Sequence, residues 1–294
     1  MHQEGTHRMT KHGSRFSERS QRAILWWGIA LAVAYGLALV FLLQQVPTKN
    51  PEWGPQQVAD FYLENQAKIK WGAVIGGWTG GFMMPILAVV AVQMARVETG
   101  GWKIWSALSL VSGALMSLLL MLPPLFWGVA AYTAPRKEPE VTALMHELAT
   151  LTLVTTDQYY VFLWVAVTVL CLRPATQLVP NNPFPRWWGY LSMWITVMFE
   201  AGAFAFVPRT GPLAWNGLLV FWSPLTLFGV WISIQSWLLF RALRHQSADS
   251  DAPAQLVRAK KDPTATPPDA QSSTRASGQP ADVTQDQSAV SKGA

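Results

Sequence analysis

Two carboxyl groups lie well inside long apolar segments of this sequence. Asp157 falls within the stretch from Leu151 to Val167, and Glu200 falls within the stretch from Trp187 to Val207. No Lys or Arg lies at a comparable depth in an apolar segment. Because a charged side chain at the centre of a bilayer costs about 2.5–3.5 kcal/mol on insertion scales, two acids without a cation need an explanation. The sequence predicts that each is protonated, hydrogen-bonded or bound to a cation.

The two acids are predicted to lie at a similar depth in neighbouring spans. At a rise of about 1.5 Å per residue, Asp157 lies about 13 Å from a span start near Leu148, and Glu200 lies about 10 Å from a span end near Val207. If these consecutive spans pack side by side, the carboxyl groups can meet and share a proton. Such a pair suits a proton relay, a cation site or a pocket for an amine-bearing solute.

Other polar side chains are predicted to gather at the same level. A regular helix places several of them within about 40° of one line on the fourth span. They are His146, Thr150, Asp157, Tyr160 and Trp164. Asn216, near the start of the sixth span, can join them. The predicted binding residues therefore include Asp157, Glu200, Tyr160, Thr150 and Asn216.

The second span carries two ridges of glycine, for which two interpretations remain. Ridges of this kind let helices approach closely, and packing is the favoured interpretation. The alternative is a helix that unwinds near Gly80 and Gly81, before Pro85, and turns Thr79 and Trp78 towards a ligand. Thr79 is added to the predicted binding residues on this alternative.

The remaining chemistry in the chain is sparse. His146 is the one histidine near any apolar segment, so a haem held by two intramembrane histidines is excluded, and the lone Cys171 excludes an internal disulfide. Two carboxylates and one distant histidine make a poor set of metal ligands. No phosphate-binding loop, hydrolase elbow or zinc-protease helix is present. We expect no metal and no cofactor.

The composition is that of a membrane protein. Of 294 residues, 51% are hydrophobic, 13% are charged and 16 are tryptophan. Crossing a hydrocarbon core about 30 Å thick takes roughly 20 apolar residues of helix. The runs that qualify are continuous rather than alternating, so we predict an all-α membrane protein, a bundle of six transmembrane helices. They are Ala23 to Leu43, Trp71 to Met94, Ile104 to Leu122, Leu148 to Leu172, Trp187 to Val207, and Leu213 to Phe240, the last with an outer end as late as Gly217.

Basic residues set the predicted orientation and domain limits. Lys and Arg concentrate on the side of both termini, which predicts that both termini are cytoplasmic. We expect a basic, mobile tail over residues 1–21, the membrane domain over 22–244, and a disordered tail over 245–294. Because the basic residues flank spans rather than one surface, no nucleic-acid partner is expected.

The first outer loop is predicted to hold one amphipathic helix. From Gln56 onward, Val58, Phe61, Tyr62 and Ile69 recur at roughly helical spacing with polar residues between them. Such a helix lies along the membrane surface or caps the bundle. Packing against the bundle is favoured over a lid above a site.

Two stretches carry a resemblance to known proteins. NPFPRWWGYLSMW, from Asn182, and TGPLAWNGLLVFW, from Thr210, resemble recurrent segments of a family of bacterial six-span integral membrane proteins with no assigned activity. The resemblance implies six spans and the bacterial cytoplasmic (inner) membrane. It implies no substrate.

Three functional hypotheses fit these residues. The first is binding or transport of a small solute or of protons through a site in the outer half of the bundle, centred on Asp157 and Glu200. The second is a non-catalytic accessory or scaffold subunit, in which both acids are neutral packing elements. The third, least favoured, is an enzyme acting on an amphipathic substrate, with the carboxyl pair as general acid and base. The expected partners are the lipid bilayer, a small-molecule or cationic solute, and other membrane proteins.

Overall fold

The computed structural model describes residues 18–261, and the side chains of residues 18–246. The chain divides into two units, Met1–Ser247 and Ala248–Ala294. The first unit contains every candidate membrane span of the described residues. Residues 18–21 and 245–261 of the two predicted tails are helical, which differs from the disorder predicted for the C-terminal tail. Residues 1–17 and 262–294 of these tails lie outside the described residues.

The six predicted spans are confirmed. All elements in the described part of the chain are helical, and six segments are long and apolar enough to cross a membrane. The sixth begins at Leu218, beside the late start that the sequence allowed. The chain is therefore an integral membrane protein with six candidate spans. These spans are Glu18–Leu42, Gln66–Val97, Ile104–Thr133, Pro139–Leu172, Arg186–Phe206 and Leu218–Gln246.

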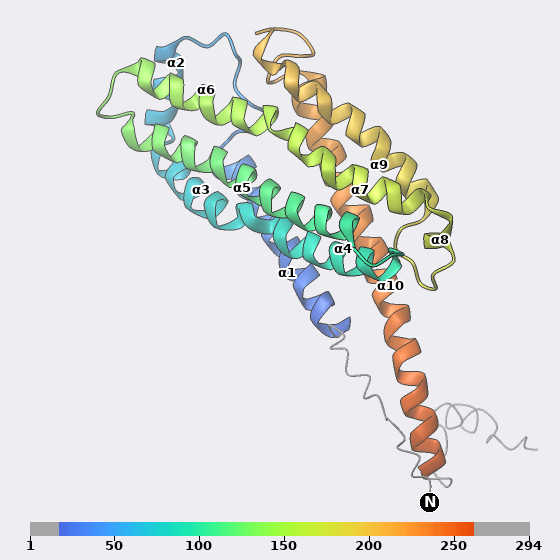
Figure 1. Ribbon diagram of the computed structural model, residues 1–294. Helices are drawn as coiled ribbons and strands as arrows, with labels where there is room; N and C mark the ends of the chain where they lie inside the picture. The colour runs from blue at the N-terminus through green and yellow to red at the C-terminus, as the bar shows by residue number, and fades with distance from the viewer. Residues whose placement is uncertain (1–17, 262–294) are drawn as a thin grey trace, which may run out of the picture. The chain divides into compact units, whose positions relative to one another are not determined.

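The second and fourth spans are interrupted between two α-helical parts, and the first, fifth and sixth spans each have an irregular stretch at one end (Figure 1). The interruptions are short π-helical or 3₁₀-helical stretches, labelled η. In chain order the elements are α1 (Glu18–Leu37), η1 (Ala38–Leu42), α2 (Pro55–Glu64), α3 (Gln66–Thr79), η2 (Gly80–Phe82), α4 (Met83–Val97), α5 (Ile104–Thr133), α6 (Pro139–Thr155), η3 (Asp157–Tyr160), α7 (Val161–Leu172), α8 (Pro174–Gln177), α9 (Arg186–Phe199), η4 (Glu200–Phe206), η5 (Leu218–Trp222) and α10 (Ser223–Lys261).

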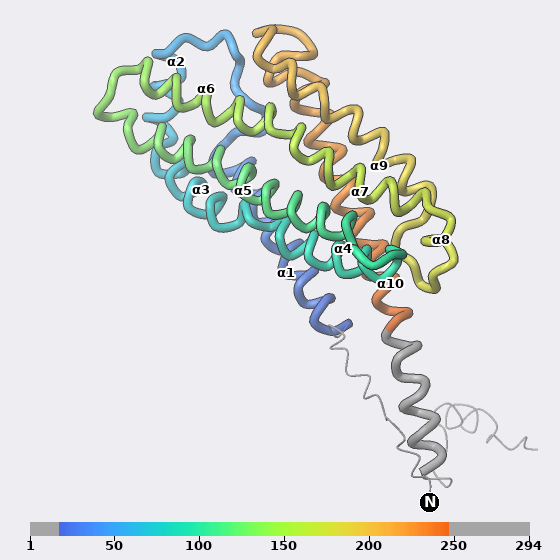
Figure 2. Tube along the Cα trace, in the orientation of Figure 1, coloured from blue at the N-terminus to red at the C-terminus, as the bar shows by residue number. Residues whose placement is uncertain are grey.

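The third span is the centre of the packing. Helix α5 contacts α3 and α4 of the second span and α6 and α7 of the fourth. Figure 2 shows α6 and α7 following one another along the molecule, with α9 beside α7. Helix α1 packs on α4 and on η2. The consecutive fourth and fifth spans are therefore neighbours, which a meeting of Asp157 and Glu200 would require.

The glycine ridge of the second span packs against neighbouring backbone. A Cβ atom on Gly72 would lie 2.8 Å from a side-chain carbon of Leu43, and one on Gly80 would lie 2.8 Å from the Cα atom of Met121. Neither position has room for a side chain. The favoured packing interpretation of this ridge is confirmed.

The same span tightens at the glycines instead of unwinding. Pro85 has no N–H, so the carbonyl of Gly81, four residues earlier, lacks its helical partner. The Ser117 hydroxyl, from α5, donates to that carbonyl at 3.2 Å and accepts the Met84 N–H at 3.0 Å. One serine of the third span therefore satisfies a carbonyl within η2 and an N–H just after it.

A proline in the third span frees a second carbonyl in the same way. Pro124 cannot donate to Leu120, and the Tyr35 hydroxyl of α1 donates to the Leu120 carbonyl at 2.8 Å. Tyr35 is buried, so this bond ties the first span to the third in the interior of the bundle.

The predicted loop helix is present in part as α2, which ends at Glu64 and packs on α6, whereas the last apolar residue of the predicted stripe, Ile69, lies on α3. The buried face of α2 carries Val58 and Tyr62, and the Tyr62 hydroxyl shares a hydrogen bond of 2.9 Å with Nδ1 of His146. The His146 ring also lies edge-on to Trp215, at 6.3 Å between centroids. Packing against the bundle, the favoured interpretation, is confirmed, and His146 serves to join three segments.

A buried acid caps the third span at its start. Glu98 accepts the backbone N–H of Trp105 and both the N–H and the hydroxyl of Ser106. Burial by itself raises the pKa of the Glu98 carboxyl, but these hydrogen bonds and the charge of Lys103 lower it below its usual value. A carboxylate at a helix N-terminus stabilises the exposed N–H groups there, so Glu98 fixes the turn between the second and third spans.

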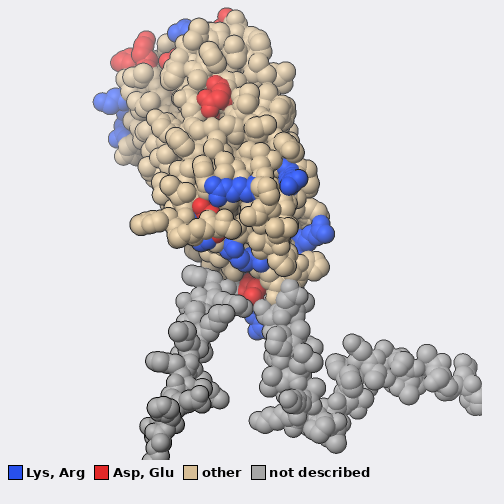
Figure 3. Space-filling model, turned by 45° about the vertical axis from the view of Figure 1, so that its right-hand side comes forward, with Lys and Arg blue, Asp and Glu red and all other residues tan. Residues whose placement is uncertain are grey.

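Charged side chains gather towards two ends of the described part of the chain. Figure 3 shows Lys and Arg mostly in the lower part of the visible face, acidic residues in both its upper and lower parts, and an uncharged area between the two parts. A broad uncharged belt between charged ends is what the hydrocarbon layer requires of a protein surface.

Candidate ligand-binding cavity

The fourth span breaks at Asp157. The hydroxyls of Thr155 and Thr156 donate to the carbonyls of Leu151 and Thr152, at 2.7 and 2.8 Å, and compete with the helical ladder. Helix α6 ends at Thr155, and the four residues of η3 follow before α7 begins. The prediction of one polar line along a continuous helix is therefore wrong across this break.

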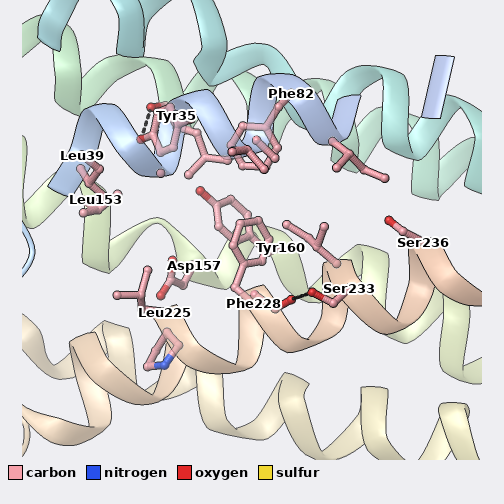
Figure 4. A pocket seen from close by; sticks show the side chains of 18 of the residues that line it. Tyr35, Leu39, Phe82, Leu153, Asp157, Tyr160, Leu225, Phe228, Ser233 and Ser236 are labelled. Carbon is pink, nitrogen blue, oxygen red and sulfur yellow. Dashed lines mark hydrogen bonds between the residues drawn. The ribbon is translucent and has the colours of Figure 1, made fainter. Parts of the chain in front are cut away.

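The break lies beside a cavity of about 600 Å³ between α1 and α10. All six spans contribute to its wall, the first and sixth most of all, and nearly all the lining side chains are apolar. Figure 4 shows α1 above this space and α10 below it, with Asp157 and Tyr160 projecting from the fourth span between them. Both residues come from η3, so the irregular turn puts a carboxyl group and a phenol on the same wall.

An aromatic cluster forms the floor of the cavity around Phe228. The ring of Phe228 stacks on Tyr160 at 6.4 Å between centroids, and it contacts Phe82 at 6.1 Å and Phe199 at 6.5 Å. Phe82 ends η2, Tyr160 ends η3, and Phe199 immediately precedes η4. The interruptions of three spans therefore each deliver one aromatic ring to the same place.

Among the residues that line the cavity, Asp157 is the only Asp, Glu, Lys, Arg or His. Its side chain is 6% exposed, and the cavity wall contains no Lys, Arg or His. Within the described residues, no side chain or backbone group forms a hydrogen bond or ion pair with its carboxyl group. A buried carboxyl group without a partner is costly to the fold, which marks Asp157 as a functional candidate.

Glu200 does not join Asp157. The segments that carry them do meet, because η3 packs on η4. The residue that approaches is Gly202, where a Cβ atom would lie 3.5 Å from Oδ2 of Asp157. Phe199 and Gly202, one turn apart, face the bundle, and this leaves Glu200 exposed on the outer side. The expected meeting of two carboxyl groups is therefore not seen, because equal depth does not fix the direction of a side chain.

The other predicted binding residues lie away from the cavity wall. Thr150 is buried on α6, and Asn216 is half-buried just before η5. The Thr79 hydroxyl donates to the carbonyl of Ile75 at 2.7 Å, and Trp78 is 84% exposed. The structure brings together only Asp157 and Tyr160 of the six residues predicted.

Several lining residues were not predicted from the sequence. Ala32 and Gly36 lie on one face of α1, and Gly229 and Ser233 lie on one face of α10. Pairs of small residues four apart are a readable signal for a helix face that another element approaches. The contribution of Phe228 had no such signal, because an aromatic residue inside an apolar run fits core, lipid and cavity equally well.

The geometry of the cavity is the evidence for what it binds. Among residues 18–246, no group of three or more His, Cys, Asp or Glu side chains is placed to hold a metal ion. Comparison of the chain with protein-family models, with curated proteins and with solved structures finds no match.

Proposed function

We propose that this membrane protein binds a small apolar or amphipathic solute in the cavity between α1 and α10, as the binding step of transport. The observation that carries the proposal is a single unpartnered carboxyl group in the wall of an otherwise apolar cavity of about 600 Å³. Cavities that hold small molecules are about 300–1,000 Å³ and are mostly apolar, with a few polar groups that orient the ligand. Asp157 and Tyr160 supply those groups.

Access to the cavity is from the side of the bundle. Trp26 and Val33 on α1, and Leu225 and Trp237 on α10, line the cavity and are also exposed. In the membrane such residues face lipid. A solute dissolved in the bilayer therefore reaches Asp157 between α1 and α10 without crossing a polar surface.

The proposed orientation has both termini in the cytoplasm of a bacterial inner membrane. It is supported by the distribution of Lys and Arg among the loops. The proposal moves the site from a pair of acids to Asp157 alone, because Glu200 is outside the cavity.

Filling the cavity is expected to weaken binding without harming the fold. Gly36 and Gly229 line the cavity, and a Cβ atom on either meets nothing within 4 Å. Leucine at either position occupies ligand space, and overfilling costs about 1–3 kcal/mol, so affinity falls roughly 5- to 150-fold. The measurement is equilibrium binding of radiolabelled dodecanol to the protein in lipid nanodiscs, with empty nanodiscs as background.

Gly81→Leu is the matched control for Gly36→Leu and Gly229→Leu. A Cβ atom on Gly81 also meets nothing within 4 Å, but this residue does not line the cavity. Binding by this variant should match that of the unmodified protein. Equal binding by all three variants would show that dodecanol occupies another surface and would refute the proposed site.

A further inference from the structure

The cavity is elongated along the first and sixth spans. It extends from Trp26 on α1 to Leu39 on η1, and along α10 from Pro224 to Phe240. At about 1.5 Å per residue these stretches are roughly 20 and 24 Å long. Both exceed half of a hydrocarbon core about 30 Å thick. This shape suits an extended alkyl chain better than a compact solute.

The two ends of the cavity differ in chemistry. Asp157 lies at one end, near Leu39, Leu153 and Leu225 (Figure 4). The other end is bounded by Trp26 and Phe240, whose rings bridge α1 and α10 at 5.0 Å between centroids. An occupant with one polar end and one apolar end therefore has a preferred direction.

Two serines line the apolar part of the cavity, and they do not change the chemical difference between its two ends. The Ser233 hydroxyl donates to the carbonyl of Gly229 at 2.7 Å, so its proton is already used within α10. The Ser236 oxygen is buried and has no hydrogen-bond partner in the described residues. Both groups are neutral, so neither can offset the charge of an ionised Asp157.

The carboxyl group of Asp157 determines which polar head group the bound molecule carries. When Asp157 is ionised, a cation must accompany it, and the cavity wall supplies none. A protonated amine supplies both a charge and N–H donors, and hydrogen bonds to charged groups are the stronger class. A neutral amine arriving from the bilayer can take the proton from the carboxylic acid, which forms an ammonium–carboxylate pair with no other reactant.

We infer that the cavity binds a single-chain amphiphile with an amine head. The head pairs with Asp157, the chain extends towards Trp26 and Phe240, and the molecule passes from the bilayer between α1 and α10. The small residues Gly36 and Gly229 leave room for that passage. This inference rests on the proposed function, since it names the class of solute for the same cavity.

The test compares three probes that share one chain and differ in the head: dodecylamine, dodecanol and dodecanoate. Binding to the protein in lipid nanodiscs is measured for the unmodified chain, Asp157→Asn and Glu200→Gln. We expect the unmodified protein to prefer the amine over the alcohol by about tenfold or more, since one charged hydrogen bond is worth about 1.5–3 kcal/mol. Dodecanoate should bind no better than dodecanol.

The two variants separate the buried acid from the exposed one. Asp157→Asn should bind amine and alcohol within about threefold of each other, because the amide keeps the shape but cannot be ionised. Glu200→Gln should keep the preference for the amine, because Glu200 is exposed and outside the cavity. An Asp157→Asn variant that keeps the full preference would overturn the inference.

A second measurement needs no variant. Infrared difference spectra of the unmodified protein should show loss of a carboxylic-acid band and gain of carboxylate bands when dodecylamine, but not dodecanol, is added. An unchanged carboxyl region on amine binding would overturn the inference. Equal affinity for amine and alcohol would do the same while leaving the proposed cavity intact. Failure of all three probes to bind would remove the proposed function as well.

Discussion

Replacing Trp164 with alanine is expected to lower the free energy of unfolding by about 3–5 kcal/mol, the usual cost of truncating a buried aromatic residue. Trp164 is fully buried on α7, and its ring contacts Phe199 at 4.4 Å, Tyr160 at 6.2 Å and Trp231 at 6.3 Å between centroids. Truncation leaves a void behind the aromatic floor of the cavity. The measurement is unfolding by sodium dodecyl sulfate in mixed micelles.

Trp194→Ala is the matched control for Trp164→Ala. Both tryptophans lie deep in their spans, but Trp194 is 50% exposed and has no ring contact of this kind among the described residues. Its truncation removes contact with lipid rather than with protein, so we expect a change within about 1 kcal/mol. Equal losses for the two variants would mean that Trp164 is not part of a packed core.

Gly202→Ala is expected to destabilise the bundle by about 1–3 kcal/mol or more, as overpacking does. A Cβ atom on Gly202 would collide with the backbone carbonyl of Val154, at the end of α6. Because a backbone atom cannot rotate away, η4 must move away from the end of α6, and this disturbs the carboxyl group of Asp157, whose Oδ2 lies 3.5 Å from the same Cβ position. The same unfolding measurement checks the loss of stability, and dodecylamine binding checks the displacement of the carboxyl group.

The same substitution at Gly36 gives the opposite expectation. Gly36 is in α1, and a Cβ atom there meets nothing within 4 Å. Alanine is favoured over glycine in a helix by about 1 kcal/mol, so Gly36→Ala should be neutral or slightly stabilising. If Gly202→Ala were equally harmless, η4 would not be in close contact with the end of α6.

The architecture was predictable from the sequence because hydrocarbon thickness imposes one strong rule on all spans. Continuous apolar runs predicted the six segments, and even the late start of the sixth span was indicated by Gly217. The spans nevertheless extend beyond the apolar runs at several ends, as at Pro139, nine residues before the predicted Leu148. Hydropathy indicates which helical turns contact lipid. It does not detect helical turns that continue beyond the lipid.

The site was only partly predictable. Asp157 was identified from the cost of a carboxyl group in the membrane, and Tyr160 from its position on the same helical line, and both line the cavity. From the sequence, Glu200 has the same cost of placing a carboxyl group in the membrane, but its side chain points outward. Tertiary packing sets the rotation of a helix about its axis, and the sequence pattern does not show it. The break in the fourth span was also hidden, because Thr155 and Thr156 fit a regular helix as readily as an interrupted one.

The interrupted spans explain how the fold places a carboxyl group in an apolar space. A regular helix would keep Asp157 on a line with its neighbours four residues away, whereas η3 turns Asp157 and Tyr160 towards the cavity together. The backbone groups freed by such interruptions are satisfied from neighbouring spans, as Ser117 does at η2. We infer that the positions of these breaks, more than the count of spans, define the binding site.

The most direct measurement is a density map of the unmodified protein in lipid nanodiscs with dodecylamine present. The proposed function predicts one extended chain of density between α1 and α10, with its polar end at Asp157 and its other end near Trp26 and Phe240. Side chains of α1 and α10 packed against each other, with no space beside Asp157, would contradict it.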